Sequence, residues 1–171
     1  MAKKNILYSG CVNDPWLEVA KKLNKVGIRP AYWVHWDKPQ ELKELKEEFS
    51  NVIIHKFSDA WRGIFPVSVK NSLGNDVHLG PPIIEDLQGE ILVGLKMMDR
   101  QDPTRNAFSF NERKKHFIDL VRAWMAILSE KEITAVVSAD IPHRVFDYSL
   151  YIAADILNIH FETFKMTPWP G

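Results

Sequence analysis

The sequence predicts an α/β domain built on a mostly parallel sheet. Short apolar runs alternate with amphipathic helical segments over the first 55 residues, and the same alternation returns between residues 109 and 162. The segments between the runs are long enough to form the crossover helices that parallel strands require. The chain has 171 residues, of which 46% are hydrophobic and 26% charged, as in one globular domain. We therefore expect a single domain over residues 1–171.

Five apolar runs, each four to six residues long, predict the strands of this sheet. The runs are 5–9, 31–35, 52–55, 133–138 and 159–162. If the crossovers between them are right-handed, the strand order is 3-2-1-4-5, with helices on both faces of the sheet. This is a three-layer, Rossmann-like arrangement.

Capping signals mark the two helices expected in the first half of the chain. Asp14 followed by Pro15 is typical of an N-cap with proline at the first helical position, and Gly27 is a typical left-handed helix end. Asp37 and Gln40 have the spacing of a capping box, which predicts the start of the second helix.

The second half contains the most strongly periodic helix of the sequence. Ser109 and Glu112 form another capping box, and the apolar face that follows predicts a helix ending near Lys131. Residues 144–157 are apolar nearly all round, as expected of a buried helix.

Residues 58–82 lack periodicity and contain several glycines and prolines together with aromatic residues. A loop of this length is usually functional or disordered, and its aromatic content favours a packed, functional loop. The next segment, 83–98, predicts a helix that is interrupted or weakened at Gly89 and Gly94.

Charge and composition disfavour several classes of function. The 22 Lys and Arg residues balance the 22 Asp and Glu residues, so there is no net positive field to attract nucleic acid. No apolar run approaches the roughly 20 residues that span a bilayer. The only cysteine, Cys11, cannot form an internal disulfide, and the histidines lack the spacing of a metal site. We expect a cytoplasmic protein without a membrane span or a bound metal.

Ligands of open parallel sheets bind beyond the carboxyl ends of the strands, near the point where the strand order reverses. In this chain that point lies between the first and fourth strands. The polar residues at the strand ends are therefore candidates for substrate binding: Ser9, Gly10, Asn13, Asp14, His35, Ser138 and Arg144. Trp16, Trp33, Trp36 and Trp61 lie in or near the same loops, where indole rings can stack on sugars, although core packing explains Trp33 equally well.

The densest polar cluster follows the fourth strand and suggests a catalytic group. If a helix begins near His143, Asp147 lies one turn further on and can orient the imidazole, while Asp140 approaches from the loop. A histidine held in this way can act as a general base. The alternative is structural: Asp140 caps the helix, Pro142 starts it, and His143 and Asp147 satisfy local groups.

Cofactor chemistry has little support in the sequence. The turn at residues 10–15 contains one glycine where a dinucleotide fingerprint needs three, which disfavours NAD binding. Cys11 lies where a helix dipole lowers thiol pKa values, yet most lone cysteines are buried, and we do not expect it to be a nucleophile. We expect no cofactor in this domain.

Several segments resemble a known family. The runs 138–143 (SADIPH) and 146–148 (FDY), with 98–103 (MDRQDP) and 108–113 (FSFNER), are similar to the amino-terminal region of bacterial capsule polysaccharide biosynthesis proteins. The likeness covers roughly residues 91–164. It implies one of the two Rossmann-like halves of a nucleotide-sugar-dependent glycosyltransferase.

The resemblance implies an acceptor-side domain that is not active alone. Its partners would be a sugar or glycan acceptor and a missing carboxyl-terminal domain that binds the nucleotide-sugar donor, and a homo-oligomer stays open. His143 would be the base, with Asp147 and Asp140 orienting it. Two alternatives also stay open: a non-catalytic binding or assembly domain that docks a partner or self-associates, and a small-molecule enzyme of the flavodoxin-like type.

Overall fold

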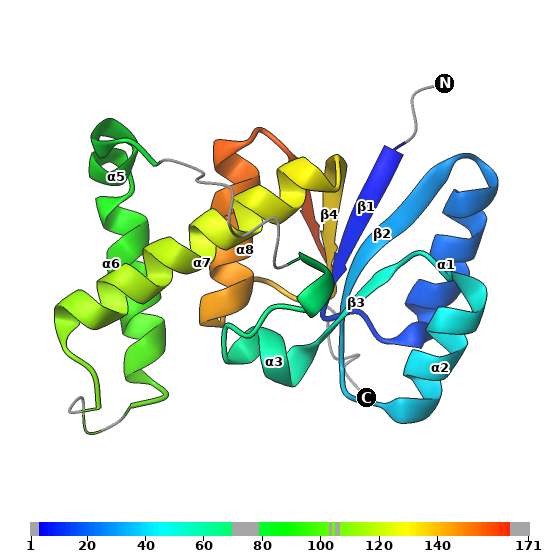
Figure 1. Cartoon of the computed structure of the whole chain (residues 1–171), viewed down its shortest axis with the longest axis horizontal. Helices are drawn as coiled ribbons and strands as arrows, with labels where there is room; N and C mark the ends of the chain where they lie inside the picture. Colours follow the sequence, from blue (N-terminus) through cyan, green and yellow to red (C-terminus); the bar gives the residue numbers. More distant parts are fainter. Residues whose placement is uncertain (1–3, 70–78, 103, 105–106, 165–171) are drawn as a thin grey trace, which may run out of the picture.

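The structure is a computed structural model that describes residues 4–69, 79–102, 104 and 107–164. Its centre is a five-stranded sheet with the order β3-β2-β1-β4-β5, and every neighbouring pair of strands is parallel (Figure 1). The strands are β1 (Lys4–Ser9), β2 (Ile28–His35), β3 (Ile53–Lys56), β4 (Ile133–Ser138) and β5 (His160–Thr163). The predicted fold class and strand order are confirmed.

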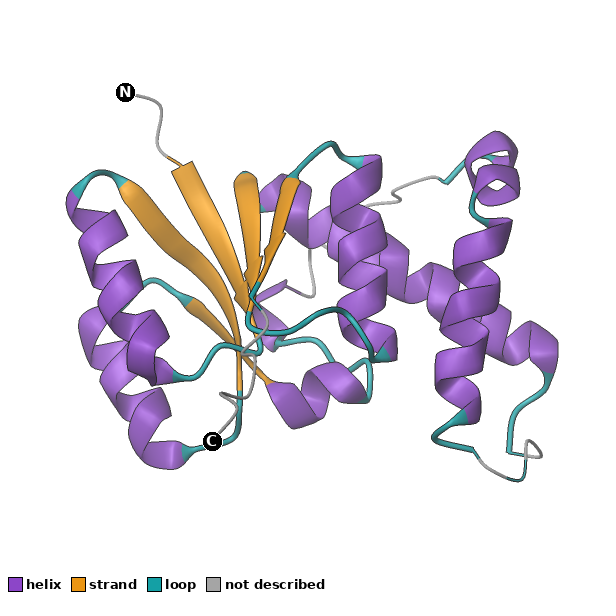
Figure 2. Ribbon diagram, turned by 180° about the vertical axis from the view of Figure 1, so that it is seen from behind, coloured by secondary structure: helices purple, strands orange, loops and turns teal. Residues whose placement is uncertain are grey.

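Helices cover both faces of the sheet and make three layers (Figures 1 and 2). One face carries α1 (Asn13–Lys25) and α2 (Pro39–Glu48). The other side of the molecule contains α3 (Phe57–Trp61), α5 (Pro81–Asp86), α6 (Gln88–Asp99), α7 (Phe110–Glu130) and α8 (Val145–Ile156). Among the described helices, none has the length and hydropathy needed to cross a bilayer.

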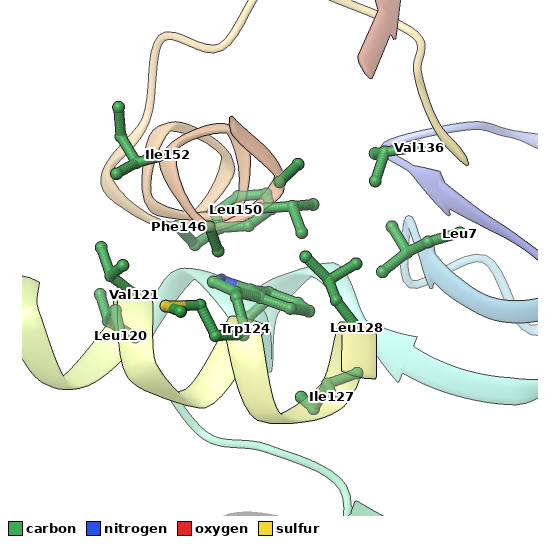
Figure 3. Close-up of a cluster of buried hydrophobic side chains, with 14 of the residues drawn as sticks. Leu7, Leu120, Val121, Trp124, Ile127, Leu128, Val136, Phe146, Leu150 and Ile152 are labelled. Carbon is green, nitrogen blue, oxygen red and sulfur yellow. The ribbon is translucent and has the colours of Figure 1, made fainter. Parts of the chain in front are cut away.

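Alternating side chains of β1 feed two separate hydrophobic cores. Leu7 belongs to the larger core beneath α7 and α8, whereas Ile6 and Tyr8 belong to the smaller core beneath α1 and α2. Trp124 of α7 lies within the larger core and is fully buried (Figure 3). Because each fully buried large apolar side chain contributes about 1.5–3 kcal/mol, these two cores fix the sheet between its helical layers.

Two of the predicted helix signals are confirmed at atomic detail. Gly27 has φ +85°, the left-handed conformation expected where α1 ends. At the start of α7, Ser109 Oγ accepts a hydrogen bond from the Glu112 amide at 3.3 Å, and Glu112 Oε2 accepts one from the Ser109 amide at 2.7 Å. This reciprocal pair is the predicted capping box.

The predicted start of α1, at Pro15 with Asp14 as its N-cap, is two residues too late. The helix begins at Asn13 with Val12 as its N-cap, and Asp14 lies inside this first turn in an extended conformation (φ −95°, ψ 125°). Pro15 explains this conformation, because its ring disfavours the helical region for the residue before it.

The capping box predicted for α2 is also wrong. The helix begins at Pro39, and Lys38, in an extended conformation, is its N-cap. Proline at the first helical position fixes a helical φ there, so the helix starts too late for Asp37 and Gln40 to cap it as a pair.

The segment predicted as an irregular loop, 58–82, is partly helical. It contains most of α3, a 3₁₀ turn at Val67–Val69 and the start of α5, while residues 70–78 lie outside the described residues. The helix predicted at 83–98 is two helices, α5 and α6, that meet at Leu87 (φ −86°, ψ 10°).

Gly94 lets α6 and α7 approach closely. A Cβ atom built on Gly94 would lie 2.5 Å from Cε2 of Phe117, a buried ring of α7. Gly89, on the same helix, is exposed, and a Cβ atom there would meet nothing within 4 Å. Of these two glycines, therefore, only Gly94 is required by packing.

We predict that Gly94→Ala lowers the free energy of unfolding by about 1–3 kcal/mol, because the added methyl group overpacks the contact with Phe117. Gly89→Ala is the matched control and should raise the free energy of unfolding by about 0.5–1 kcal/mol through its higher helix propensity. Urea unfolding of both variants measures the difference. Equal effects would contradict the assigned role of Gly94.

Candidate functional site

The candidate site lies where β1 and β4 end side by side. Ser9 and Ser138 are register partners in the two strands, and the Ala139 amide donates a hydrogen bond to the Ser9 carbonyl at 3.0 Å. Beyond this point the chain leaves β1 for α1 on one face and leaves β4 for α8 on the other. The two turns diverge, which opens a crevice at the reversal of strand order.

We call the resulting pocket the switch-point crevice. It has a volume of about 170 Å³. Its lining consists of Ser9, Gly10, Trp36, Phe57, Ser138, Ala139, Asp140, Arg144, Phe146 and Asp147. Four of the predicted substrate-binding residues and two of the predicted catalytic residues are therefore brought together.

Gly10 shapes the β1 side of the crevice. Its φ of +66° places it in the left-handed region, which favours glycine. Its amide donates to the Val34 carbonyl at 2.9 Å, and its carbonyl accepts from Trp36 Nε1 at 3.0 Å. The turn is thus fixed to β2 and to one of the rings that line the crevice.

Arg144 lies among three aromatic rings. Its guanidinium carbon is 5.1 Å from the ring centroid of Phe57, 5.7 Å from that of Trp36 and 5.8 Å from that of Trp61. Nη1 is also 3.7 Å from Asp147 Oδ2. These contacts hold a partly buried positive charge at the crevice.

Asp147 is the acid that caps α8. Its Oδ1 accepts a hydrogen bond from the Arg144 amide at 2.7 Å, and its side chain is 7% exposed. Burial raises the pKa of this carboxyl to about 6, although the Arg144 amide and the nearby His143 partly offset the increase. The carboxyl group therefore titrates just below neutral pH.

His143 lies on the outer side of the turn between β4 and α8. Its Nδ1 is 2.8 Å from the Ile141 carbonyl, 3.5 Å from Asp140 Oδ2 and 4.0 Å from Asp147 Oδ2, and the side chain is 40% exposed. Because a carbonyl can only accept, this contact places the ring proton on Nδ1 and leaves the Nε2 lone pair free for a ligand.

The structure adds two details to the predicted arrangement of this turn. The Ile141 carbonyl is the nearest acceptor for His143 Nδ1, whereas Asp147 pairs with the imidazole only at 4.0 Å, because its Oδ1 is engaged as the cap of α8. Asp140 does not cap the helix, because its Oδ1 accepts from the adjacent Ile141 amide at 2.9 Å. Among the described residues, those lining the crevice do not include His143.

A contact from outside the sheet supports the same turn. Arg100, at the carboxyl end of α6, donates from Nη2 to the His143 carbonyl. Residues 98–103 and residues 138–143, two of the segments with the family resemblance, are thus in contact.

Three predicted ligand-binding residues lie in a different environment. His35 is fully buried and its Nε2 lies 3.1 Å from Asn13 Oδ1, while Asn13 Nδ2 donates to the Glu41 carbonyl at 2.8 Å. Asp14 is exposed on the first turn of α1. We correct the assignment: His35 and Asn13 connect β2 and α1 to α2, and none of the three lines the crevice.

Cys11 is a structural residue. Its side chain is fully buried and donates weakly to the Ser9 carbonyl at 3.5 Å. Burial raises the pKa of the thiol, which opposes formation of the nucleophilic thiolate. The nearby Trp33 stacks on Tyr8 with ring centroids 4.3 Å apart and belongs to the core.

Phe57 was missed as a site residue by the sequence analysis. It stacks on Trp36 with ring centroids 3.8 Å apart and lines the crevice. A signal was present, because Phe57 directly follows β3 and so lies at the same edge of the sheet as the other strand ends.

A second hollow, which we call the outer hollow, lies beyond Trp61. It has a volume of about 810 Å³ and extends from the end of α3 to the first turns of α7. Its lining includes the apolar residues Trp61, Met98, Phe108 and Val145 and the charged residues Arg62, Glu112, Arg113 and Asp119. Trp61 therefore separates it from the guanidinium of Arg144.

Comparisons with protein-family models, with curated proteins and with solved structures found no match to this chain. The geometry of the crevice and the sequence resemblance are therefore the observations from which a function can be inferred.

We predict that wild-type stability increases relative to Asp147→Asn as the pH falls. The folded-state pKa of about 6 lies above the ordinary aspartate value of 3.8, so the folded chain takes up the proton first and acid favours folding. Between pH 7 and pH 4 the difference in free energy of unfolding should change by about 2 kcal/mol in favour of the wild type. Asparagine keeps a side-chain oxygen that can accept the hydrogen bond from the Arg144 amide.

Urea unfolding of the two proteins at a series of pH values measures this change, and the comparison cancels the titration of other groups. Asp155→Asn removes an exposed carboxylate from the same helix and controls for the loss of charge. A difference that stays constant with pH would contradict the buried, perturbed carboxyl group.

Proposed function

We propose that this chain is the acceptor-side domain of a nucleotide-sugar-dependent glycosyltransferase of capsule or surface polysaccharide synthesis. One observation carries the proposal: Ser138, Ala139, Asp140, Phe146 and Asp147, which belong to the segments with the family resemblance, line the switch-point crevice. Ligands of this fold class bind at that position. The aromatic rings and polar groups of the crevice suit a sugar, which has both apolar faces and hydroxyl groups.

In the proposed reaction His143 is the general base. Nε2 takes the proton of an acceptor hydroxyl while the oxygen forms a bond to the anomeric carbon of the donor. The bond from that carbon to the phosphate oxygen breaks, and the nucleotide leaves with the electron pair. Asp140, 3.5 Å from the imidazole, stabilises the positive charge that develops on the ring.

The donor is assigned to a second α/β domain. The β1–α1 turn contains a single glycine and lacks a dinucleotide fingerprint. By this proposal the chain binds an acceptor without turnover, and transfer requires the donor-binding domain. The proposal includes a cytoplasmic location, in keeping with a lone, reduced cysteine.

Binding of sugars to the chain tests the first part of the proposal. We predict that monosaccharides and short glycans shift the backbone amide signals of residues 9–10 and 138–140 in NMR titrations of the ¹⁵N-labelled chain. The uncharged nucleosides uridine and guanosine should leave these signals unchanged. Shifts with the nucleosides alone would move the donor site into this domain and contradict the assignment.

We predict that His143→Gln, in the enzyme that joins this domain to its donor-binding domain, lowers kcat for sugar transfer by about 10²–10⁴-fold. The expected reason is loss of the base, so KM for the acceptor should change little. His160→Gln is the matched control, since His160 is 70% exposed at the amino end of β5, away from the crevice. A near-normal kcat for His143→Gln would remove its role as base.

Sugar titrations, together with light scattering, distinguish the proposed function from the main alternative, a non-catalytic assembly domain. An assembly domain would self-associate or dock a partner and bind no sugar, and light scattering of the chain would show self-association directly. Sugar binding by a monomeric chain would exclude that alternative.

A further inference from the structure

We propose that Arg144 is an anion-recognition group and that the ligand of the switch-point crevice carries a carboxylate or a phosphate group. The inference rests on the proposed function, because it names the chemical class of the acceptor: an acidic sugar rather than a neutral one.

The rings fix the position of the guanidinium. Phe57 and Trp61 come from α3 and Trp36 follows β2, and each ring centroid lies within 6 Å of the guanidinium carbon. Aromatic faces attract a cation and exclude water from it without using its N–H groups. The planar fork is thereby held in one place, as bidentate recognition of a carboxylate or phosphate requires.

The guanidinium of Arg144 also has hydrogen-bond donors with which it can bind a ligand. It carries five N–H groups. Within the described part of the chain, its side chain makes no hydrogen bond to an acceptor, and its one ion pair, with Asp147 Oδ2, is 3.7 Å long. The side chain is only 22% exposed, so water cannot solvate it fully. A partly buried cation of this kind is stabilised by an anion that enters the crevice.

The carboxylates of the crevice are already engaged with backbone amides. Asp147 Oδ1 accepts from the Arg144 amide at 2.7 Å, and Asp140 Oδ1 accepts from the Ile141 amide at 2.9 Å. Asp140 is also 58% exposed, so its second oxygen can accept hydrogen bonds from sugar hydroxyls. The crevice thus has a positive end at Arg144 and an accepting rim at Asp140.

The size of the switch-point crevice agrees with a positive end at Arg144 and an accepting rim at Asp140. Its volume of about 170 Å³ equals that of about five or six water molecules in the liquid. This space admits a carboxylate or phosphate with the ring atoms next to it, while the rest of a glycan extends outward past Asp140.

The test compares four probes on the ¹⁵N-labelled chain: glucuronate, glucose 6-phosphate, neutral glucose and inorganic phosphate. NMR titration follows the amides of residues 9–10 and 138–140 and the Nε signal of Arg144. We expect at least one of the two acidic sugars to bind at least about tenfold more tightly than glucose, because the guanidinium donates charge-assisted hydrogen bonds to an anion and only neutral ones to glucose. The better of glucuronate and glucose 6-phosphate identifies the anion as carboxylate or phosphate. Equal binding of the acidic sugars and glucose would overturn the inference.

Variants test whether Arg144 causes the preference for acidic sugars. Arg144→Gln should abolish the preference for acidic sugars. Arg62→Gln is the matched control, because Arg62 belongs to the neighbouring turn but is 63% exposed and donates to Asp59 Oδ1 at 2.7 Å. It should keep the full preference. Arg144→Lys keeps a charge that can contact the rings but loses the fork, so it should fold and show a reduced preference. Unchanged preference in either Arg144 variant overturns the inference.

The outcomes separate this inference from the proposed function. If glucose and the acidic sugars bind alike, the anion subsite is wrong and the acceptor-binding function stands. If no sugar binds but inorganic phosphate shifts the Arg144 Nε signal, the anion subsite stands and the acceptor-binding function is wrong. If neither the sugars nor inorganic phosphate binds, both are wrong.

Discussion

The parallel pairing of β1 with β2 on one side and with β4 on the other is the constraint on which the other features depend. It buries β1 on both faces, so its side chains must alternate between the two cores. It also brings Ser9 beside Ser138 and sends the following turns to opposite faces of the sheet. A crevice at this position is therefore a consequence of strand order, whatever residues line it.

Much of the fold could be predicted because its signals are local. The period of apolar residues located all the strands, and the Ser109–Glu112 capping box located the long helix, since both patterns are properties of a few adjacent residues. The predicted start of α2 was wrong because two local signals compete there. Pro39, as the first helical residue, determines the start in place of the capping box at Asp37. Gly89 indicated an interruption two residues from the observed break at Leu87, whereas the short helix α3 has no comparable local signal.

The candidate site was only partly predictable. The strand-end rule identified Ser9, Gly10, Ser138 and Arg144, since topology alone brings strand ends together. The same rule wrongly included His35, whose burial against Asn13 and α2 depends on tertiary contacts. Of the three rings around Arg144, Phe57 and Trp61 lie one turn apart in α3, but Trp36 follows β2, and no spacing in the sequence relates it to the other two.

The close contact at Gly94 is linked to the candidate site through Arg100. Gly94 and Arg100 belong to α6 and its C-cap: the first fits against Phe117 of α7, and the second holds the His143 carbonyl. Through the hydrogen bond from Arg100, the position of α6 along α7 bears on the turn between β4 and α8, which carries the imidazole of His143. Among the described residues, α6 contributes no side chain to the crevice itself, so its influence on the candidate site is indirect.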